Sequence, residues 1–189
     1  LLLEKGAVRI PLLSQQEVNT ITNSLHSEYF SSASSNNIIT PAKLSVTQGN
    51  GKCGEYFSIN TMNNKLLQTV IETTKEWIKS HITLSTPLGT KSILLRYGMG
   101  GVNYAHHDDS GDYQALLILS KPGVDYNGGV FYLAESDPPH VVHEFPFEGA
   151  GELIVFCGRK EKYLHGMTEV TPGTAGEETT KRFAVGLFQ

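Results

Sequence analysis

Apolar residues recur at helical spacing in two segments of the first half of the chain. In the first segment Ser14 and Glu17 form a capping box, in which each side chain can bond the other residue's backbone N–H at the start of a helix. This pattern predicts a helix over residues 14–29. Asn63 or Asn64 can cap a second helix. Its expected apolar positions are Leu66, Leu67, Val70, Ile71, Trp77 and Ile78. We expect this helix to pack on a sheet, with its tryptophan in the core rather than at a cofactor.

Short apolar runs bounded by turn residues predict β-strands elsewhere in the chain. In the first half these runs cover residues 6–11, 43–47 and 55–59. In the second half they cover residues 93–97, 113–119, 129–133, 151–157 and 182–188. The sequence Asp-Tyr-Asn-Gly-Gly at residues 125–129 is typical of a tight turn. Residues 31–37 are rich in Ser and Asn and predict a polar surface loop.

The distribution of these elements predicts the fold class. Helices gather in the first half and strands in the second, which indicates a mainly β protein with flanking helices, in the α+β class. We expect an antiparallel barrel or a double-sheet jelly roll. A chain of 189 residues suits one domain with a sizeable core. We expect residues 1–90 to form a helical support region and residues 91–189 to form the jelly-roll core.

Composition narrows the possible partners. With 39% hydrophobic and 18% charged residues, the chain has the balance of a globular protein. A net charge of −4 argues against an extended basic surface for duplex nucleic acid, although it leaves a local basic groove open. Cys53 and Cys157 lie far apart and are expected to be buried thiols, which favours a reducing, intracellular setting. No apolar run is long enough to suggest a membrane span.

The candidate chemistry follows the run at residues 93–97 and its glycine-rich turn, where the chain reads His106-His107-Asp108-Asp109. Residues two apart on a strand share a face. Either His106 with Asp108 or His107 with Asp109 could therefore bind one divalent metal. An isolated His-x-Asp tripeptide is more often a solvated turn, but here it follows an apolar strand.

A third metal ligand is needed from elsewhere, and His165 is the best candidate because it lies on a later strand-like run. Two histidines and one carboxylate that leave other metal positions open form the facial triad of non-haem Fe(II) oxygenases. Arg182 opens the last apolar run of the chain. These residues form an ordered set, although each is a weak signal alone.

At this point a family resemblance emerges. The stretches that carry it are Arg96-Tyr97-Gly98, Tyr104-Ala105-His106-His107-Asp108, residues 113–119, Tyr126-Asn127-Gly128-Gly129, residues 151–156, Leu164-His165-Gly166 and Lys181-Arg182-Phe183. In this order they resemble the Fe(II)/2-oxoglutarate-dependent oxygenases of the prolyl-4-hydroxylase-like branch, over residues 91–189. The resemblance implies a double-stranded β-helix, with Fe(II) and 2-oxoglutarate as cofactors and ascorbate as an optional reductant.

The resemblance also implies roles for individual residues. His106, Asp108 and His165 take the places of the iron ligands, and Arg182 takes the place of the basic residue that holds the distal carboxylate of 2-oxoglutarate. A planar guanidinium suits this task because it can bind a carboxylate through two N–H groups. Tyr97 matches an aromatic residue that lines the cosubstrate pocket. His107 with Asp109 remains the alternative ligand pair.

Two features depart from the family pattern. Many relatives carry a tyrosine that contacts the cosubstrate on the strand after the turn, whereas residues 116–119 read Leu-Leu-Ile-Leu. We expect Tyr97, Tyr104 or Gln114 to contact the cosubstrate instead. The spacing from His165 to the basic residue is also longer than usual. The extra residues, 171–180, predict a loop between two barrel strands.

The expected activity is hydroxylation of a C–H bond, with a prolyl or other amino-acid side chain of a protein or peptide as the favoured substrate. The same chemistry on a modified nucleobase or a small metabolite is one alternative. A jelly-roll metalloprotein without oxygenase activity, or a binding domain, is another. No acid–base dyad is required. The polar residues around Pro138-Pro139 predict a solvated loop, and they are Glu135, Asp137, His140 and His143. We expect the loops at residues 31–37 and 171–180 to select the substrate.

Overall fold

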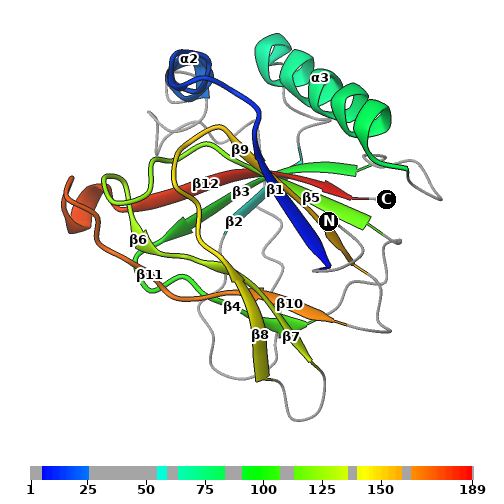
Figure 1. Ribbon diagram of the computed structural model, residues 1–189. Helices are drawn as coiled ribbons and strands as arrows, with labels where there is room; N and C mark the ends of the chain where they lie inside the picture. The colour runs from blue at the N-terminus through cyan, green and yellow to red at the C-terminus, as the bar shows by residue number, and fades with distance from the viewer. Residues whose placement is uncertain are drawn as a thin grey trace.

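In the part of the chain that the structure describes, two α-helices, two larger β-sheets and a short two-stranded ribbon form the fold (Figure 1). The structure is a computed structural model that describes residues 6–25, 55–58, 64–83, 91–106, 113–135, 140–158 and 163–188. Its helical elements are α2 (Gln15–Leu25), α3 (Lys65–His81) and the 3-10 helix η3 (Glu177–Thr179). Its strands are β1 (Ala7–Pro11), β2 (Glu55–Ser58), β3 (Lys91–Gly98), β4 (Asn103–His106), β5 (Tyr113–Ile118), β6 (Asn127–Gly128), β7 (Phe131–Glu135), β8 (His140–Phe145), β9 (Glu152–Cys157), β10 (Leu164–Met167), β11 (Val170–Thr171) and β12 (Lys181–Phe188).

The strands form a jelly-roll arrangement of antiparallel sheets. The larger sheet has the order β1-β9-β5-β12-β3-β2, the smaller has the order β4-β10-β7-β8, and β11 pairs with β6 in a short two-stranded ribbon. Figure 1 shows α2 and α3 on the side of the larger sheet that faces away from the smaller one. The predicted fold class is confirmed. β1 and β2, from the first half of the chain, are part of the larger sheet.

The larger sheet buries both of its faces. On β3, Leu94 belongs to the apolar cluster under the helices, whereas Leu95 and Tyr97 belong to the cluster between the sheets. On β12, Val185 packs towards the helices and Ala184 towards the smaller sheet. Because successive side chains alternate between two buried faces, these strands read as continuous apolar runs in the sequence.

Both helices begin at their predicted caps. The Ser14 N–H donates to the Glu17 carboxylate at 2.8 Å, and the Glu17 N–H donates to Ser14 Oγ at 3.3 Å. Hydrogen bonds from the Ser14 hydroxyl and backbone N–H hold the pKa of the Glu17 carboxyl below its ordinary value. Asn64 caps α3, since its Oδ1 accepts from the Leu67 N–H at 2.9 Å. Across the described residues, no helix combines the length and apolar character needed to cross a membrane.

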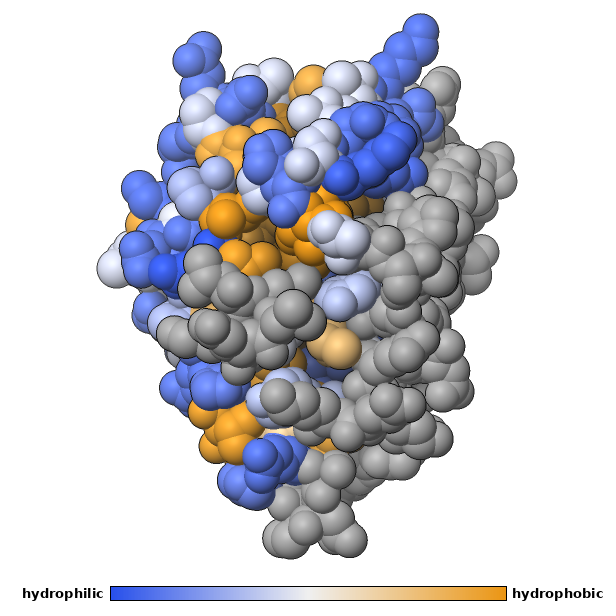
Figure 2. Space-filling model, turned by 45° about the vertical axis from the view of Figure 1, so that its right-hand side comes forward, coloured by the Kyte–Doolittle hydropathy of each residue, from blue (hydrophilic) through white to orange (hydrophobic). Residues whose placement is uncertain are grey.

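The outer surfaces of the helices are polar. Figure 2 shows hydrophobic residues recessed between hydrophilic ones on this face of the molecule. Trp77 is only partly buried against the cluster under the helices, with its ring stacked on that of His81 at 4.2 Å between centroids. The prediction that Trp77 packs towards the core is therefore confirmed in part.

Most of the predicted strands are present. β1, β2, β3, β5, β7, β9 and β12 lie within or overlap the apolar runs that predicted them. The predicted strand at residues 43–47, the loop at residues 31–37 and the expected end of the first helix beyond Leu25 fall outside the described residues. The loop predicted at residues 171–180 contains the end of β11 and the short helix η3.

The predicted tight turn at residues 125–129 is wrong in position. The chain turns earlier, where the Gly123 N–H bonds to the Tyr126 carbonyl at 2.7 Å, and Asn127–Gly128 form β6. Gly128 has φ +63°, and a Cβ there would lie 2.1 Å from the Glu169 carbonyl oxygen. Glycine at this position therefore permits close approach of two strands, rather than a hairpin turn.

The solvated loop predicted around His140 and His143 is also wrong in part, because residues 140–145 form β8. This strand pairs with β7 on one side only and lies at the edge of the smaller sheet. An edge strand tolerates polar side chains because one of its sides meets solvent. Val141, for example, is 49% exposed. Asp137 lies outside the described residues.

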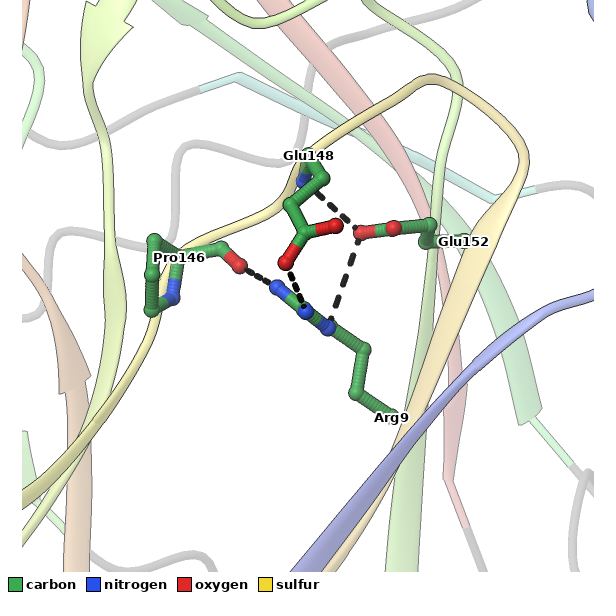
Figure 3. A network of polar contacts seen from close by, with 4 residues as sticks. All are labelled: Arg9, Pro146, Glu148 and Glu152. Atoms are coloured by element: carbon green, nitrogen blue, oxygen red, sulfur yellow. Dashed lines mark hydrogen bonds and ion pairs between the residues drawn. The ribbon is translucent and has the colours of Figure 1, made fainter.

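Arg9 ties β1 to the segment between β8 and β9 (Figure 3). Its Nη2 lies 2.6 Å from a Glu148 carboxylate oxygen, and its Nη1 donates to the Pro146 carbonyl. Glu152 completes the network by accepting from the Glu148 N–H at 3.0 Å. The network holds the Pro146–Glu148 segment against the sheet, and Phe147 within this segment is buried.

Asn64 gives a test of the helix layer. Its Nδ2 donates to Ser24 Oγ of α2 at 2.8 Å, so one buried side chain caps α3 and joins the two helices. We expect Asn64→Ala to reduce the free energy of unfolding by about 1–2 kcal/mol, measured by urea denaturation. Asn64→Asp keeps the cap acceptor and should cost less. An Asp variant as unstable as the Ala variant would show that the cap is not the main contribution.

Candidate functional site

Two predicted metal ligands, His106 and His165, lie side by side on the smaller sheet. They are directly opposite each other in the antiparallel pair of β4 and β10. Their ring centroids are 4.4 Å apart, with an angle of 51° between the ring planes. Imidazole groups at this separation are close enough for both to reach one ion.

The backbone of β4 sets the orientation of His106. The register between β4 and β10 shifts between the pairs His165–His106 and Met167–Asn103, which is a β-bulge. His106 Nδ1 lies 2.7 Å from the Tyr104 carbonyl oxygen. Because a carbonyl oxygen only accepts, the proton must be on Nδ1, and Nε2 carries the lone pair that a metal would use.

His165 lies deeper than His106, in an aromatic wall. It is 5% exposed, and its ring centroid is 4.9 Å from that of Phe156 and 6.3 Å from that of Phe131. The next residue, Gly166, allows the strands to pack closely, since a Cβ there would lie 2.4 Å from the Tyr132 hydroxyl oxygen. A histidine enclosed in this way has a restricted ring orientation, which suits a metal ligand.

The third predicted ligand, Asp108, lies outside the described residues, as do His107 and Asp109. Within the ranges that the structure describes, no three His, Cys, Asp or Glu side chains are grouped as a metal would require. His106 and His165 thus fit two of the three positions of a His-Asp-His metal site. The chain leaves β4 at His106 and runs directly into the segment that contains the predicted carboxylate.

Arg182 is buried on the larger sheet, at the start of β12. It is 1% exposed, and neither Nε nor Nη2 has a hydrogen-bond partner among the described residues. Its guanidinium carbon lies 5.6 Å from the ring centroid of Phe147 and 6.0 Å from that of Tyr126. A buried charge without a partner is costly, and two N–H groups without acceptors fit the two oxygens of a carboxylate. The arrangement therefore fits the distal carboxylate of 2-oxoglutarate.

Two neighbours shape the space around Arg182. Tyr97 on β3 is its direct partner across the sheet and is 3% exposed, on the face that lies towards the smaller sheet. Gly129 has φ +57°, and a Cβ there would lie 2.8 Å from Arg182 Cδ. A side chain at residue 129 would therefore collide with the arginine.

The other predicted cosubstrate contacts have different surroundings. Tyr104 on β4 is 46% exposed, whereas Gln114 on β5 is 1% exposed. Gln114 shares its strand face with Leu116 and Ile118, which pack in the cluster between the sheets. The side chain of Gln114 therefore faces the interior where Tyr97 lies, and the side chain of Tyr104 meets solvent.

Sequence reasoning missed Tyr126 as a site residue. Its side chain is 1% exposed, and its hydroxyl has no hydrogen-bond partner within the described part of the chain. Burial raises the pKa of Tyr126, and the nearby positive charge of Arg182 lowers this pKa in part. The available signal was its place directly before Asn127-Gly128-Gly129, a stretch that contributed to the family resemblance.

Comparisons with known proteins agree with this geometry. A family model named Oxygenase-NA, described as an oxygenase catalysing oxidative methylation of damaged DNA, matches residues 58–170, more than half of the chain. No curated protein matches the sequence significantly. Similar solved structures number 181 chains, so the fold is widespread.

Three of these structures illustrate the likeness. A Pseudomonas putida prolyl-4-hydroxylase has a TM-score of 0.64 at 14% identity, covering 99% of this chain and 93% of that one. A Trichoplax adhaerens prolyl hydroxylase, in complex with a hypoxia inducible factor peptide fragment, has a TM-score of 0.62 at 15% identity, with 99% and 84% covered. HygX from Streptomyces hygroscopicus, with iron bound, has a TM-score of 0.62 at 13% identity, with 99% and 83% covered.

These matches confirm the predicted fold and enzyme class. HygX has also been solved with nickel and 2-oxoglutarate bound. Because the family model matches more than half of the sequence, the chain belongs to the Oxygenase-NA family of oxygenases, and it has the fold of the 2-oxoglutarate- and Fe(II)-dependent enzymes related to prolyl-4-hydroxylase.

Proposed function

We propose that this protein is a dioxygenase that uses Fe(II) and 2-oxoglutarate to hydroxylate a C–H bond of its substrate. His106, Asp108 and His165 hold the iron, and Arg182 binds the distal carboxylate of 2-oxoglutarate. When bound, the two cofactors supply dioxygen activation, in which 2-oxoglutarate becomes succinate and carbon dioxide while one oxygen atom enters the substrate. The protein orients these groups and excludes water.

The observation that carries this proposal is the buried guanidinium of Arg182. Its Nε and Nη2 lack acceptors among the described residues, and its side chain is 1% exposed. A hydrolase or isomerase that used the same histidine pair would not need a buried cation of this kind. A cosubstrate with a second carboxylate would need it.

The orientation of His106 supports the ligand pair His106 and Asp108 over His107 and Asp109. His106 faces His165 across the sheet, with the ring centroids 4.4 Å apart. In an extended continuation of the strand His107 would project from the opposite face, whereas Asp108 would project from the same face as His106. The whole chain is proposed to act as one domain, with residues 1–90 supporting the jelly-roll core of residues 91–189.

The favoured substrate is a prolyl or other amino-acid side chain in a protein or peptide. Two prolyl hydroxylases share the fold over 99% of this chain, and one of them was solved with a peptide. The net charge of −4 also disfavours a large phosphate-binding surface. The surface of α3 also offers little free positive charge for phosphate groups, because two of its lysines are paired with glutamates. Lys75 lies 2.8 Å from Glu72, and Lys79 lies 3.9 Å from Glu76.

A methylated nucleobase is the second candidate substrate. It is favoured by the description of the matched family, which refers to damaged DNA. Hydroxylation of an N-methyl group would release formaldehyde and leave the unmodified base, so the same site chemistry would serve. Single-stranded DNA needs a smaller basic surface than a duplex, and base stacking on exposed aromatic side chains contributes to its binding.

Turnover without substrate tests the enzyme class. We expect the wild-type protein, given Fe(II), ascorbate and 2-oxoglutarate in air, to form succinate slowly, and His165→Ala to form none. Succinate formation should rise when the true substrate is added, either proline-containing peptides or methylated single-stranded oligonucleotides. Formaldehyde release would identify the nucleobase. A wild-type protein that gives no succinate in any arm would exclude the proposed chemistry.

The metal ligands are tested by iron content. Loss of a group that only orients a ligand costs about 10- to 100-fold in metal affinity, so we expect His106→Ala, Asp108→Ala and His165→Ala to cost more. Metal analysis after anaerobic loading, with circular dichroism as the folding control, measures this. His107→Ala is the matched control and should retain iron. If its loss of iron equals that of His106→Ala, the ligand pair moves to His107 and Asp109.

Arg182→Met tests the carboxylate site while keeping apolar volume. Removing one partner of a buried charge pair costs at least about 2 kcal/mol, so the Kd for 2-oxoglutarate should rise about 30-fold or more. The Tm of the ligand-free protein should not fall, because no carboxylate among the described residues is paired with the buried charge. Lys181→Met, on the opposite strand face, is the control. Unchanged 2-oxoglutarate binding by Arg182→Met would refute the assignment.

A further inference from the structure

The turn that carries Tyr126 is attached to the segment that follows β11. The Thr174 N–H bonds to the Gly123 carbonyl at 3.1 Å, and the Ala175 N–H bonds to the Val124 carbonyl at 3.0 Å. Asn127 Nδ2 also donates to the Pro172 carbonyl at 2.6 Å. Figure 1 shows β6 and β11 side by side at one end of the molecule. This segment belongs to residues 171–180, the part of the chain that makes the spacing from His165 to Arg182 long.

The packing between the turn and this segment is very close. A Cβ on Gly173 would lie 2.1 Å from the Val124 carbonyl oxygen and 2.7 Å from the Tyr126 N. The turn is also fixed to β12, because the Lys181 N–H donates to the Asp125 carbonyl at 3.1 Å. The residues on both sides of Tyr126 are therefore held by backbone contacts, which fix the place where its side chain enters the core.

Tyr126 and Arg182 meet inside the protein with unused donors. Both side chains are 1% exposed, and the Tyr126 hydroxyl, Arg182 Nε and Arg182 Nη2 all lack partners among the described residues. The guanidinium carbon lies 6.0 Å from the centre of the tyrosine ring. Buried polar groups are nearly always paired, so several that gather at one place point to a ligand that is held there.

We propose that the Tyr126 hydroxyl is a second donor to the distal carboxylate of 2-oxoglutarate, and that residues 171–180 position it. This inference rests on the proposed function. On β5 the residues that face the interior are Gln114, Leu116 and Ile118, so this strand offers no phenol hydroxyl on that face. Tyr126 supplies one from a different element. The absent tyrosine and the longer segment would then be two parts of one change.

The test compares Tyr126→Phe with the wild-type protein in anaerobic calorimetric titration of the Fe(II)-loaded proteins with 2-oxoglutarate. Loss of a hydrogen bond to a charged group should weaken binding about 10- to 100-fold. Iron content should be unchanged, and the Tm of the ligand-free protein should not fall, because the hydroxyl has no hydrogen-bond partner among the described residues. Tyr132→Phe, on the smaller sheet, is the control and should bind 2-oxoglutarate like the wild type.

The positioning role is tested with Gly173→Ala, whose methyl group would push the turn away from its place. We expect weaker 2-oxoglutarate binding in this variant, and no further weakening when it is combined with Tyr126→Phe, since both changes remove one interaction. Gly149→Ala is the matched control, because a Cβ at residue 149 meets no atom within 4 Å. Additive losses in the double variant would overturn the positioning role.

The outcomes separate this inference from the proposed function. If the Fe(II)-loaded wild type fails to bind 2-oxoglutarate, the proposed function is wrong. If the wild type binds and Arg182→Met does not, while Tyr126→Phe binds within twofold of the wild type, only the role of Tyr126 is wrong. If Tyr126→Phe lowers the Tm of the ligand-free protein, the hydroxyl stabilises the fold itself. In that case the hydroxyl is structural and the inference is overturned.

Discussion

Arg182, which is enclosed in the protein and is not paired with a carboxylate among the described residues, is the constraint on which the rest of the site depends. Transfer of a charge from water into the interior costs several kcal/mol unless a partner offsets it. Around Arg182 the described residues supply aromatic rings, from Tyr126 and Phe147, and a glycine, Gly129, but no carboxylate. Among the described residues no carboxylate is paired with this cation, and an anion from solution could supply the missing partner. The unpaired charge lowers the stability of the ligand-free protein. It also favours binding of a small acid, because the donors are already oriented and desolvated before the acid binds.

The histidine pair suits a ligand of the opposite charge: Arg182 suits an anion, whereas His106 and His165 suit a metal cation. The Nδ1–H of His106 is directed at a backbone carbonyl, which leaves Nε2 as the nitrogen that would reach a metal. His165 lies among phenylalanine rings, which restrict the orientation of its ring. Two imidazoles placed side by side suit a divalent cation, whereas the buried guanidinium of the larger sheet suits an anion. A keto acid with two carboxylates, bound to iron, would complement both sheets.

Local sequence patterns predicted most of the fold because the controlling interactions are themselves local. The capping box at Ser14 and the cap at Asn64 each involve residues three apart, and the apolar runs of β3 and β12 reflect burial on both sheet faces. β8 was not predicted, since an edge strand keeps polar residues and carries little periodic signal. His165 and Arg182 could be proposed from residue type and order. Their environments could not, because burial depends on contacts between distant segments, as does the lack of acceptors for Arg182 Nε and Nη2 among the described residues.

The role proposed for Tyr126 illustrates why comparing strand positions with the family pattern can miss a site residue. The strength of a hydrogen bond to a carboxylate depends on the position of the donor. It does not depend on whether the donor comes from a strand or from a turn. What matters is that the donor is held, and here glycines allow this. Gly128 touches Glu169, Gly129 touches Arg182 and Gly173 touches Val124, each at a distance that leaves no room for a Cβ. Backbone packed this closely leaves little space for water, and electrostatic interactions are stronger where water is excluded. The glycines thus do more than permit turns, because they allow the backbone to pack closely around the place where the two proposed donors, Tyr126 and Arg182, meet.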